Sequence, residues 1–345
     1  MFTPLPVRDL HHLLKVAEPD LTAFRGARIF MTGGTGFFGR WLTESWIQAQ
    51  ATLDLQGELH LLSRNPEARL HEIPHLHAAK GLFIHKGDQT SFIFPEGTFD
   101  AVIHGAIEHG NPSETFLTNL DGTRRVLTFA HQARAARLLL ISSGAVYGPQ
   151  PPELERTPET HPTAQNPLDT SSAYSLAKGA SEFLAAAMTQ AGGPACVIAR
   201  AFAFVGPGLP LDRNYAIGNF IRDALGTGPI RIEGDGTPLR SYLYASDLTA
   251  WLWALLARGT AGEAYNVGSP ESLSILELAQ LVRNVLCPGR EITLGAAPDP
   301  TRKPPRYVPD TSKAMGELGL RIDVRLEEAL QRTADWARTG ACTWA

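Results

Sequence analysis

The chain has 345 residues, of which 43% are hydrophobic and 19% are charged, and its formal net charge is -4 at pH 7. This length is ample for a large buried core, and the slightly acidic balance gives no electrostatic reason to expect nucleic acid or an anionic membrane as a partner. The three cysteines, Cys196, Cys287 and Cys342, are too few and too far apart for a disulfide framework or a Cys-x-x-Cys metal site, which favours a reducing compartment.

The N-terminal segment lacks the basic-then-apolar pattern of a secretion signal. Elsewhere no apolar run approaches the roughly 18 residues of a membrane span, so we expect a cytoplasmic protein without a membrane partner. Leu10, Leu13 and Leu14 recur at helical spacing among charged residues. This pattern predicts a helical extension over residues 1–26.

From Arg28 onward, short apolar runs alternate with longer amphipathic stretches. Such alternation is typical of strands joined by crossover helices, and it predicts an α/β fold with a doubly wound parallel sheet. The strands are expected at residues 28–32, 59–63, 81–85, 101–104, 138–142 and 196–199.

The second part of the chain lacks this alternation of apolar runs and amphipathic stretches. Proline and glycine become frequent after Gly206, a helix is expected near residues 219–225, and residues 298–309 are rich in proline. We therefore expect a smaller, mixed C-terminal lobe. The binding cleft should lie between the lobes, beyond the carboxyl ends of the parallel strands.

A glycine-rich segment follows the first expected strand and opens a helix. It contains Gly33, Gly36, Phe37, Phe38 and Gly39. Glycine permits a tight turn and lets a pyrophosphate approach backbone N–H groups, while the helix N-terminus contributes partial positive charge. The spacing alone also suits a plain glycine turn, but its position in an alternating chain favours a dinucleotide site.

The end of the second expected strand carries Arg64 where a carboxylate would ordinarily bind the adenosine ribose. Arginine pairs well with a 2′-phosphate, so NADP is favoured over NAD. A solvated surface charge is the alternative for Arg64. At the end of the third strand, Asp88 is a candidate for the adenine pocket or, alternatively, a turn cap.

Tyr174 and Lys178 stand four residues apart, on one face of an expected helix. A phenol has a pKa of about 10, and a fixed neighbouring cation favours its ionised form, which can exchange a proton with a substrate hydroxyl. Ser143, at the end of an apolar strand, offers a hydroxyl to the same oxygen. Tyr-x-x-x-Lys alone is common, so its weight comes from these companions.

Together with the glycine run, Ser143 ahead of Val146-Tyr147-Gly148 and the Tyr174–Lys178 pair resemble the extended short-chain dehydrogenase/reductase family over nearly the whole chain. The resemblance implies that Tyr174 is the acid/base, that Lys178 holds the nicotinamide ribose, and that Ser143 binds the reacting oxygen. Asn119, in an Asn-x-x-Gly-Thr segment, would complete the catalytic set.

By the same resemblance, residues 27–205 form a Rossmann-type dinucleotide domain and residues 206–345 a substrate lobe, with a chain crossing between them left open. The resemblance also implies a homodimer, in which the helix that carries Tyr174 and the helix that follows Asn119 pack against their symmetry mates.

The C-terminal half resembles the nucleotide-sugar branch of that family. The similar segments are Arg200 with Gly206-Pro207, Gly234-Asp235-Gly236 followed by Arg240, Asp247, and Tyr265-Asn266-Val267-Gly268. The resemblance implies that Arg240 contacts a nucleotide diphosphate and that Asn219 lines the sugar-nucleotide channel. The asparagine expected three residues after Arg200 is replaced by Ala203.

Gly144 and Ala145 are a second departure from the family pattern. The 4,6-dehydratases that resemble this chain carry Asp-Glu there, and the sugar-acid decarboxylases carry a glutamate. Elimination needs an acid and a base beyond the hydride machinery, so epimerisation or keto reduction fits these residues better. Glu108 and His109 are candidates for a replacement acid or base, or are polar residues of an exposed loop.

The leading hypothesis is a nucleotide-sugar epimerase or 4-ketoreductase that uses NADP or NAD. The alternatives are a reductase of a carbonyl compound without a nucleotide, and a non-catalytic dinucleotide sensor. We expect no metal, because His71, His75 and His77 lack the carboxylates or thiolates of a metal site. Trp251 and Trp253 lie in an apolar helical run and are expected in the core.

Overall fold

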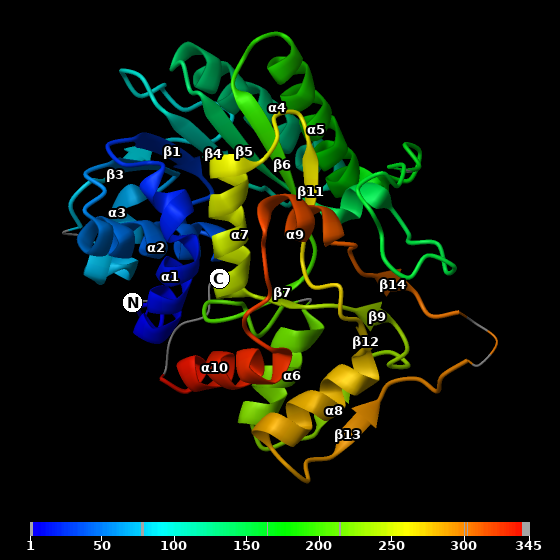
Figure 1. The fold of residues 1–345 in the computed structure, drawn as a ribbon. Helices are drawn as coiled ribbons and strands as arrows, with labels where there is room; N and C mark the ends of the chain where they lie inside the picture. Colours follow the sequence, from blue (N-terminus) through cyan, green and yellow to red (C-terminus); the bar gives the residue numbers. More distant parts are fainter. Residues whose placement is uncertain are drawn as a thin grey trace.

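The computed structural model describes residues 3–76, 79–163, 165–213, 215–299, 301 and 303–339, so His77 and Cys342 lie outside it. Its largest element is a seven-stranded sheet in the order β11-β6-β5-β4-β1-β2-β3 (Figure 1), in which all neighbours run parallel. The strands are β1 Arg28–Thr32, β2 Glu58–Ser63, β3 Leu82–Lys86, β4 Ala101–His104, β5 Arg137–Ser143, β6 Ala195–Ala201 and β11 Ala264–Val267. The predicted α/β fold with a doubly wound parallel sheet is confirmed.

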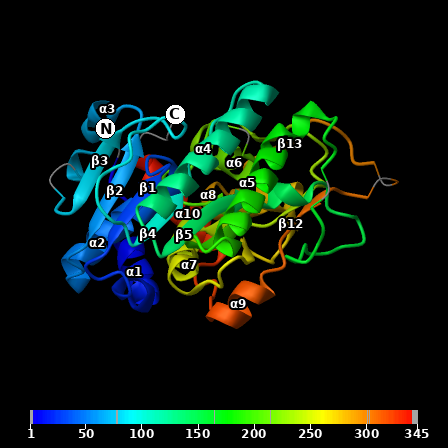
Figure 2. The same cartoon turned by 90° about the horizontal axis from the view of Figure 1, so that it is seen from above.

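Helices cover both faces of this sheet (Figure 2). One face carries α4 (Pro112–Gln132) and α5 (Ala173–Gln190), and the other carries α1 (Val7–Thr22), α2 (Phe37–Leu53) and α7 (Ala245–Arg258). In β1, Phe30 packs in the core beside α4, whereas Ile29 and Met31 pack in the core beside α2 and α7. The central strand β1 is therefore buried on both sides, as its continuous apolar run predicted, whereas the edge strand β3 is partly exposed.

The C-terminal lobe consists of short strands and three longer helices, at the bottom of Figure 1. The helices are α6 Ala216–Leu225, α8 Ile275–Leu286 and α10 Leu326–Arg338, and the strands are β7 Phe204–Val205, β8 Ile230–Ile232, β9 Leu239–Arg240, β10 Leu243–Tyr244, β12 Leu273–Ser274, β13 Ile292–Leu294 and β14 Arg306–Tyr307. The described chain also has two further short α-helices, α3 Pro66–Glu72 and α9 Ser312–Leu318, and three 3-10 helices, η1 Pro74–Leu76, η2 Gly144–Tyr147 and η3 Thr170–Ser172.

The chain crosses between the two lobes. Although they follow residue 205, α7 packs against the large sheet and β11 pairs with β6 at its edge. The division at residues 205 and 206 stays a prediction, with these two elements belonging to the first lobe. Trp251 and Trp253 of α7 are fully buried, which confirms that they are core residues.

The N-terminal helix α1 is anchored by buried ion pairs. Asp9, which is 1% exposed, pairs with Arg332 of α10 and accepts a hydrogen bond of 2.6 Å from the Tyr244 hydroxyl. Asp20 pairs with Arg258 of α7 at 2.6 Å. The extension therefore joins the sheet-covering helix α7 to the C-terminal lobe.

None of the helices in the described ranges is long and apolar enough to cross a membrane. Cys196 and Cys287 are free thiols, the first buried in the core and the second half-buried.

Candidate active site

The glycine-rich turn lies between β1 and α2 and approaches other backbone very closely. Gly33 has a φ of +74°, and a Cβ there would lie 2.4 Å from the carbonyl carbon of Gly105. A Cβ on Gly36, by contrast, would meet only one atom, at 3.5 Å. No described side chain caps the N-terminus of α2, which begins at Phe37. The open space at Gly36 and the uncapped helix N-terminus together fit the pyrophosphate of a dinucleotide.

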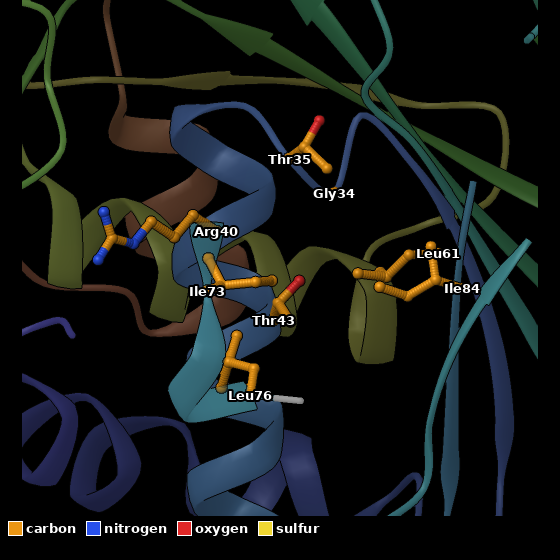
Figure 3. A pocket seen from close by; sticks show the side chains of 8 residues that line it. All are labelled: Gly34, Thr35, Arg40, Thr43, Leu61, Ile73, Leu76 and Ile84. Atoms are coloured by element: carbon orange, nitrogen blue, oxygen red, sulfur yellow. The ribbon is translucent and has the colours of Figure 1, made fainter. Parts of the chain in front are cut away.

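A small cavity lies behind this turn, between α2 and strands β2 and β3 (Figure 3). Gly34 and Thr35 form its edge, and its walls are largely apolar, from Leu61, Ile73, Leu76 and Ile84. The cavity has few groups able to exchange a proton, so the reacting groups must be sought elsewhere.

The two residues predicted at the adenosine end are already engaged with the chain itself. Arg64 has a 70% exposed side chain and pairs with Glu108, with 2.8 Å between Nη1 and Oε2. Asp88 accepts hydrogen bonds at Oδ1 from the backbone N–H and the hydroxyl of Thr90, as a turn cap does. Binding of adenosine by Arg64 and Asp88 stays a prediction.

Ser143 and Tyr174, which are 31 positions apart in the sequence, meet at the carboxyl end of β5. Ser143 is 7% exposed, its Oγ accepts from the backbone N–H of Ala145 at 3.2 Å, and it forms a hydrogen bond with Tyr174. Burial raises the pKa of Tyr174, and the hydrogen bond with Ser143 opposes that shift. The structure therefore brings together the two groups predicted to hold the reacting oxygen.

Lys178 lies one turn after Tyr174 on α5 and is buried. Its Nζ donates to the carbonyl oxygen of Ile141 at 2.8 Å. Burial lowers the pKa of Lys178 to about 8, an effect that the carboxylate of Glu182 opposes. Burial also lowers the pKa of the neighbouring His104 to about 3, so that its neutral ring bridges Thr32 and Thr123.

The side chain of Asn119 holds the loop that follows β4. Its Oδ1 accepts from the N–H of Glu108 at 2.9 Å, and its Nδ2 donates to the carbonyl oxygens of Glu108 and Thr115. This loop carries His109, whose ring centroid lies 5.9 Å from that of Tyr174. Of the two candidate acids or bases in the loop, His109 is thus beside the phenol, whereas Glu108 is paired with Arg64.

Two aromatic residues that the motif analysis did not select complete the site. Phe202 lies against Gly144, where a Cβ would come within 2.6 Å of its ring. The ring of Tyr307 packs on Phe202 with centroids 4.6 Å apart, and its hydroxyl lies 3.5 Å from Ser143 Oγ. In the sequence, Phe202 directly follows β6 and Tyr307 lies in the proline-rich segment. Neither position belongs to a recognisable motif.

Arg240 reaches the same place from the C-terminal lobe, because β9 pairs with β14. Its guanidinium carbon lies 6.0 Å from the centre of the Tyr307 ring. Asn219 lies half-buried on α6, where its Oδ1 accepts from Arg222 at 3.2 Å. Side chains of both lobes therefore meet around Ser143.

Arg200, in contrast, bonds to side chains of elements that carry the site. It forms an ion pair of 2.7 Å with Glu182, which in turn accepts a hydrogen bond from Ser142. It also donates to the hydroxyl of Tyr147 at 2.8 Å. Its partners are protein groups, consistent with a structural role.

Comparison with known proteins identifies the family. The model of the NAD dependent epimerase/dehydratase family matches residues 29–268. The chain belongs to this family.

Relatives within and around this family include UDP-glucuronic acid decarboxylase 1 from Arabidopsis thaliana, which is 31% identical over 88% of this chain and 68% of that protein. The enzyme of the same name from Xenopus tropicalis is 30% identical over 90% of this chain and 72% of that protein. The expected resemblance to the extended short-chain dehydrogenases is thereby confirmed.

Solved structures agree with this assignment. Epimerase Mth375 from Methanothermobacter thermautotrophicus has a TM-score of 0.76 at 25% identity and covers 95% of this chain and 96% of its own. The dTDP-glucose 4,6-dehydratase DesIV from Streptomyces venezuelae, solved with NAD bound, has a TM-score of 0.75 at 27% identity and covers 90% of this chain and 97% of its own. The protein is thus a nucleotide-sugar modifying enzyme of an NAD-dependent family.

Proposed function

We propose that the protein is a nucleotide-sugar epimerase or 4-ketoreductase in which Tyr174 carries the proton of the reacting hydroxyl. The observation that carries this proposal is the meeting of Ser143 and Tyr174 at the carboxyl end of β5, next to Gly144 and Ala145, which have no acidic side chain. Arg240 lies beyond them, with its guanidinium carbon 6.0 Å from the centre of the Tyr307 ring.

When bound, the nicotinamide dinucleotide accepts a hydride from a sugar carbinol carbon or returns one to a keto carbon. On oxidation, the ionised Tyr174 takes the hydroxyl proton as the C–H bond breaks and the C=O bond forms. Ser143 donates a hydrogen bond to that oxygen throughout. On reduction, the neutral Tyr174 returns its proton to the same oxygen, so the proton count balances over the cycle.

Gly144 and Phe202 disfavour dehydration and decarboxylation. Gly144 has no side chain to move a proton, and the ring of Phe202 fills the space that a side chain would enter. An acid or base at this position typically contributes roughly a hundredfold to ten-thousandfold in rate. His109 is the remaining candidate, because its ring lies beside Tyr174.

The product of the reaction tests the proposal directly. UDP-linked and dTDP-linked hexoses, incubated with the protein and NAD, are expected to give epimers of unchanged mass. Nucleotide-linked 4-keto hexoses, incubated with NADPH, are expected to gain two hydrogens. UDP-glucuronic acid is the matched substrate that tests for decarboxylation. Mass spectrometry that shows efficient loss of water or of carbon dioxide would contradict the proposal.

Tyr174→Phe is the corresponding variant, and Tyr265→Phe is its control. Both remove one hydroxyl from a tyrosine ring, but Tyr265 bonds to Glu317 at 2.7 Å and lies in β11. Turnover should be lost in the first and kept in the second, while both still bind the cofactor. Turnover near that of the native protein in Tyr174→Phe would show that the phenol is not the proton carrier.

The second candidate is a reductase of a carbonyl compound without a nucleotide, which the alanine at position 203 favours. Calorimetry with UDP and dTDP separates the two candidates. Binding of either nucleotide, weakened by Arg240→Ala, supports the nucleotide-sugar enzyme, and failure of both to bind supports the simpler reductase.

We also propose that NADP is preferred over NAD. The support is the exposed guanidinium of Arg64 at the end of β2, whose partner Glu108 would be displaced by a 2′-phosphate. Arg64→Glu is expected to weaken NADP binding roughly tenfold or more relative to NAD. Arg124→Glu, an exposed change on α4, is the matched control. An unchanged affinity ratio in Arg64→Glu would leave Arg64 as a surface charge.

A further inference from the structure

Tyr307 introduces a second phenol into the reaction centre from a distant part of the chain. It lies on β14, 164 residues after Ser143, and its hydroxyl is 3.5 Å from Ser143 Oγ. Its ring is held between Phe202, at 4.6 Å, and the guanidinium of Arg240, at 6.0 Å. Tyr307 is thus held by contacts of its ring as well as of its hydroxyl.

The hydrogen bond between Tyr307 and Ser143 has a preferred donor. Among the described residues the hydrogen-bond partner of the Tyr307 hydroxyl is Ser143, with 3.5 Å between the two oxygens. A buried phenol requires a hydrogen-bond partner, and a phenol is a better donor than acceptor because its oxygen lone pair is delocalised into the ring. Burial raises the pKa of Tyr307, which keeps its proton in place. These properties favour Tyr307 as the donor and Ser143 Oγ as the acceptor in this contact of two hydroxyls.

Ser143 then has both of its acceptor positions filled. A hydroxyl has one proton to donate and two lone pairs to accept with. The backbone N–H of Ala145 occupies one lone pair, at 3.2 Å, and Tyr307 occupies the other. The serine proton is then left to donate, and Tyr174 is the neighbouring group that can accept it.

We propose that Tyr307 is a positioning residue of the reaction centre, which acts by donating to Ser143 Oγ and so directs the Ser143 proton toward Tyr174 and the substrate oxygen. This rests on the proposed role of Tyr174 as proton carrier. A serine held as a donor stabilises the ionised phenol before oxidation and the carbonyl oxygen after it. Without Tyr307, the Ser143 hydroxyl is free to rotate and to accept instead.

Other titratable groups surround the two phenols and stay unchanged in the test. They include Tyr147 of η2 (Gly144–Tyr147), Arg240 of β9, His109 after β4 and Tyr215 ahead of α6, together with Lys178, one turn after Tyr174 on α5.

Tyr307→Phe removes the hydroxyl and keeps the ring that packs on Phe202. Losing the neutral hydrogen bond from Tyr307 to Ser143 should raise the pKa of Tyr174 by roughly half a unit to one unit. A titration followed by phenolate absorbance measures this pKa without turnover. The absorbance change that belongs to Tyr174 is identified because it is missing in Tyr174→Phe. Below that pKa, kcat should fall about three- to tenfold while KM changes less than about twofold.

Tyr265→Phe is the matched control for the loss of a buried tyrosine hydroxyl, and it should leave the pKa of Tyr174 unchanged. A double-mutant cycle with Ser143→Ala shows whether Tyr307 acts through the serine. In the Ser143→Ala background, Tyr307→Phe should have no further effect on the titration or on kcat.

Additive effects of the two changes, or an unshifted Tyr174 titration in Tyr307→Phe, would overturn the proposal. Either result is distinguishable from failure of the proposed function, which would appear as full turnover in Tyr174→Phe. Cofactor binding and the urea midpoint of each variant show that it is folded.

Discussion

Asp247 is expected to make the stability of the protein fall as pH rises. This residue of α7 is 3% exposed, and its Oδ2 accepts from the backbone N–H groups of Asp323 and Val324 at 3.2 and 3.1 Å. Burial and, to a lesser extent, the like charge of Asp323 raise the pKa of Asp247 to about 7. From α1, His12 lies 3.6 Å from Asp323, and Arg332 of α10 opposes the shift.

The sign follows from proton binding in the two states. Between an ordinary aspartate pKa of 3.8 and the folded value of about 7, the folded chain keeps a proton that the unfolded chain releases. The corresponding stabilisation is complete below the lower value and is lost as pH rises through the higher one. Its full size is at most roughly 4 kcal/mol, of which roughly 2 to 3 kcal/mol should be lost between about pH 5 and pH 8.

Asp247→Asn removes this dependence and keeps an oxygen for the two backbone donors. The free energy of unfolding, from urea titrations across that range, should therefore rise in the variant relative to the native protein as pH increases. Asp121→Asn on α4, whose side chain is 52% exposed, is the control and should run parallel to the native protein. A constant difference between Asp247→Asn and the native protein would refute a proton held by Asp247.

Two further predictions concern surfaces and anchors. If α4 and α5 form the proposed homodimer, Phe183→Glu at a 72% exposed residue of α5 should give a monomer in light scattering, whereas Ile93→Glu at an 87% exposed residue should not. A monomeric native protein contradicts the homodimer. Asp9→Asn, which leaves Arg332 without its buried partner, should lower the free energy of unfolding by about 3 kcal/mol, and Tyr244→Phe by about 2 kcal/mol, in urea titrations. Losses below about 1 kcal/mol for Asp9→Asn would show that α1 is not anchored there.

The fold could be predicted because its signals are local. Six of the seven strands of the large sheet are continuous apolar runs, and the helix before them has regular apolar spacing. The seventh strand, β11, was not predicted as part of this sheet. It has four residues and comes 63 positions after β6 ends, so its pairing with β6 depends on contacts far apart in the sequence.

The candidate site also combines residues that local sequence patterns select with a residue that they do not. Tyr174 and Lys178 are linked by helical spacing, and Ser143 is marked by the end of an apolar strand, so a pattern in the sequence selects all three. Tyr307 reaches Ser143 only because β14 pairs with β9 in the C-terminal lobe, which places residues 306–307 beside 239–240. No local pattern in a proline-rich segment records that pairing.

The groups assembled around Ser143 limit the chemistry that the site can perform. They are hydroxyls, a buried ammonium and an imidazole, and Phe202 fills the space beside Gly144 where an acidic side chain would lie. Phenols with an ordinary pKa of about 10 exchange protons readily with sugar hydroxyls, whereas removal of a proton from carbon needs a stronger or better-placed base. A site of this composition is suited to moving a hydride and a hydroxyl proton together and poorly suited to eliminating water. If a dehydration product nevertheless forms, His109 is the residue whose replacement by glutamine should abolish it while leaving oxidation and reduction intact.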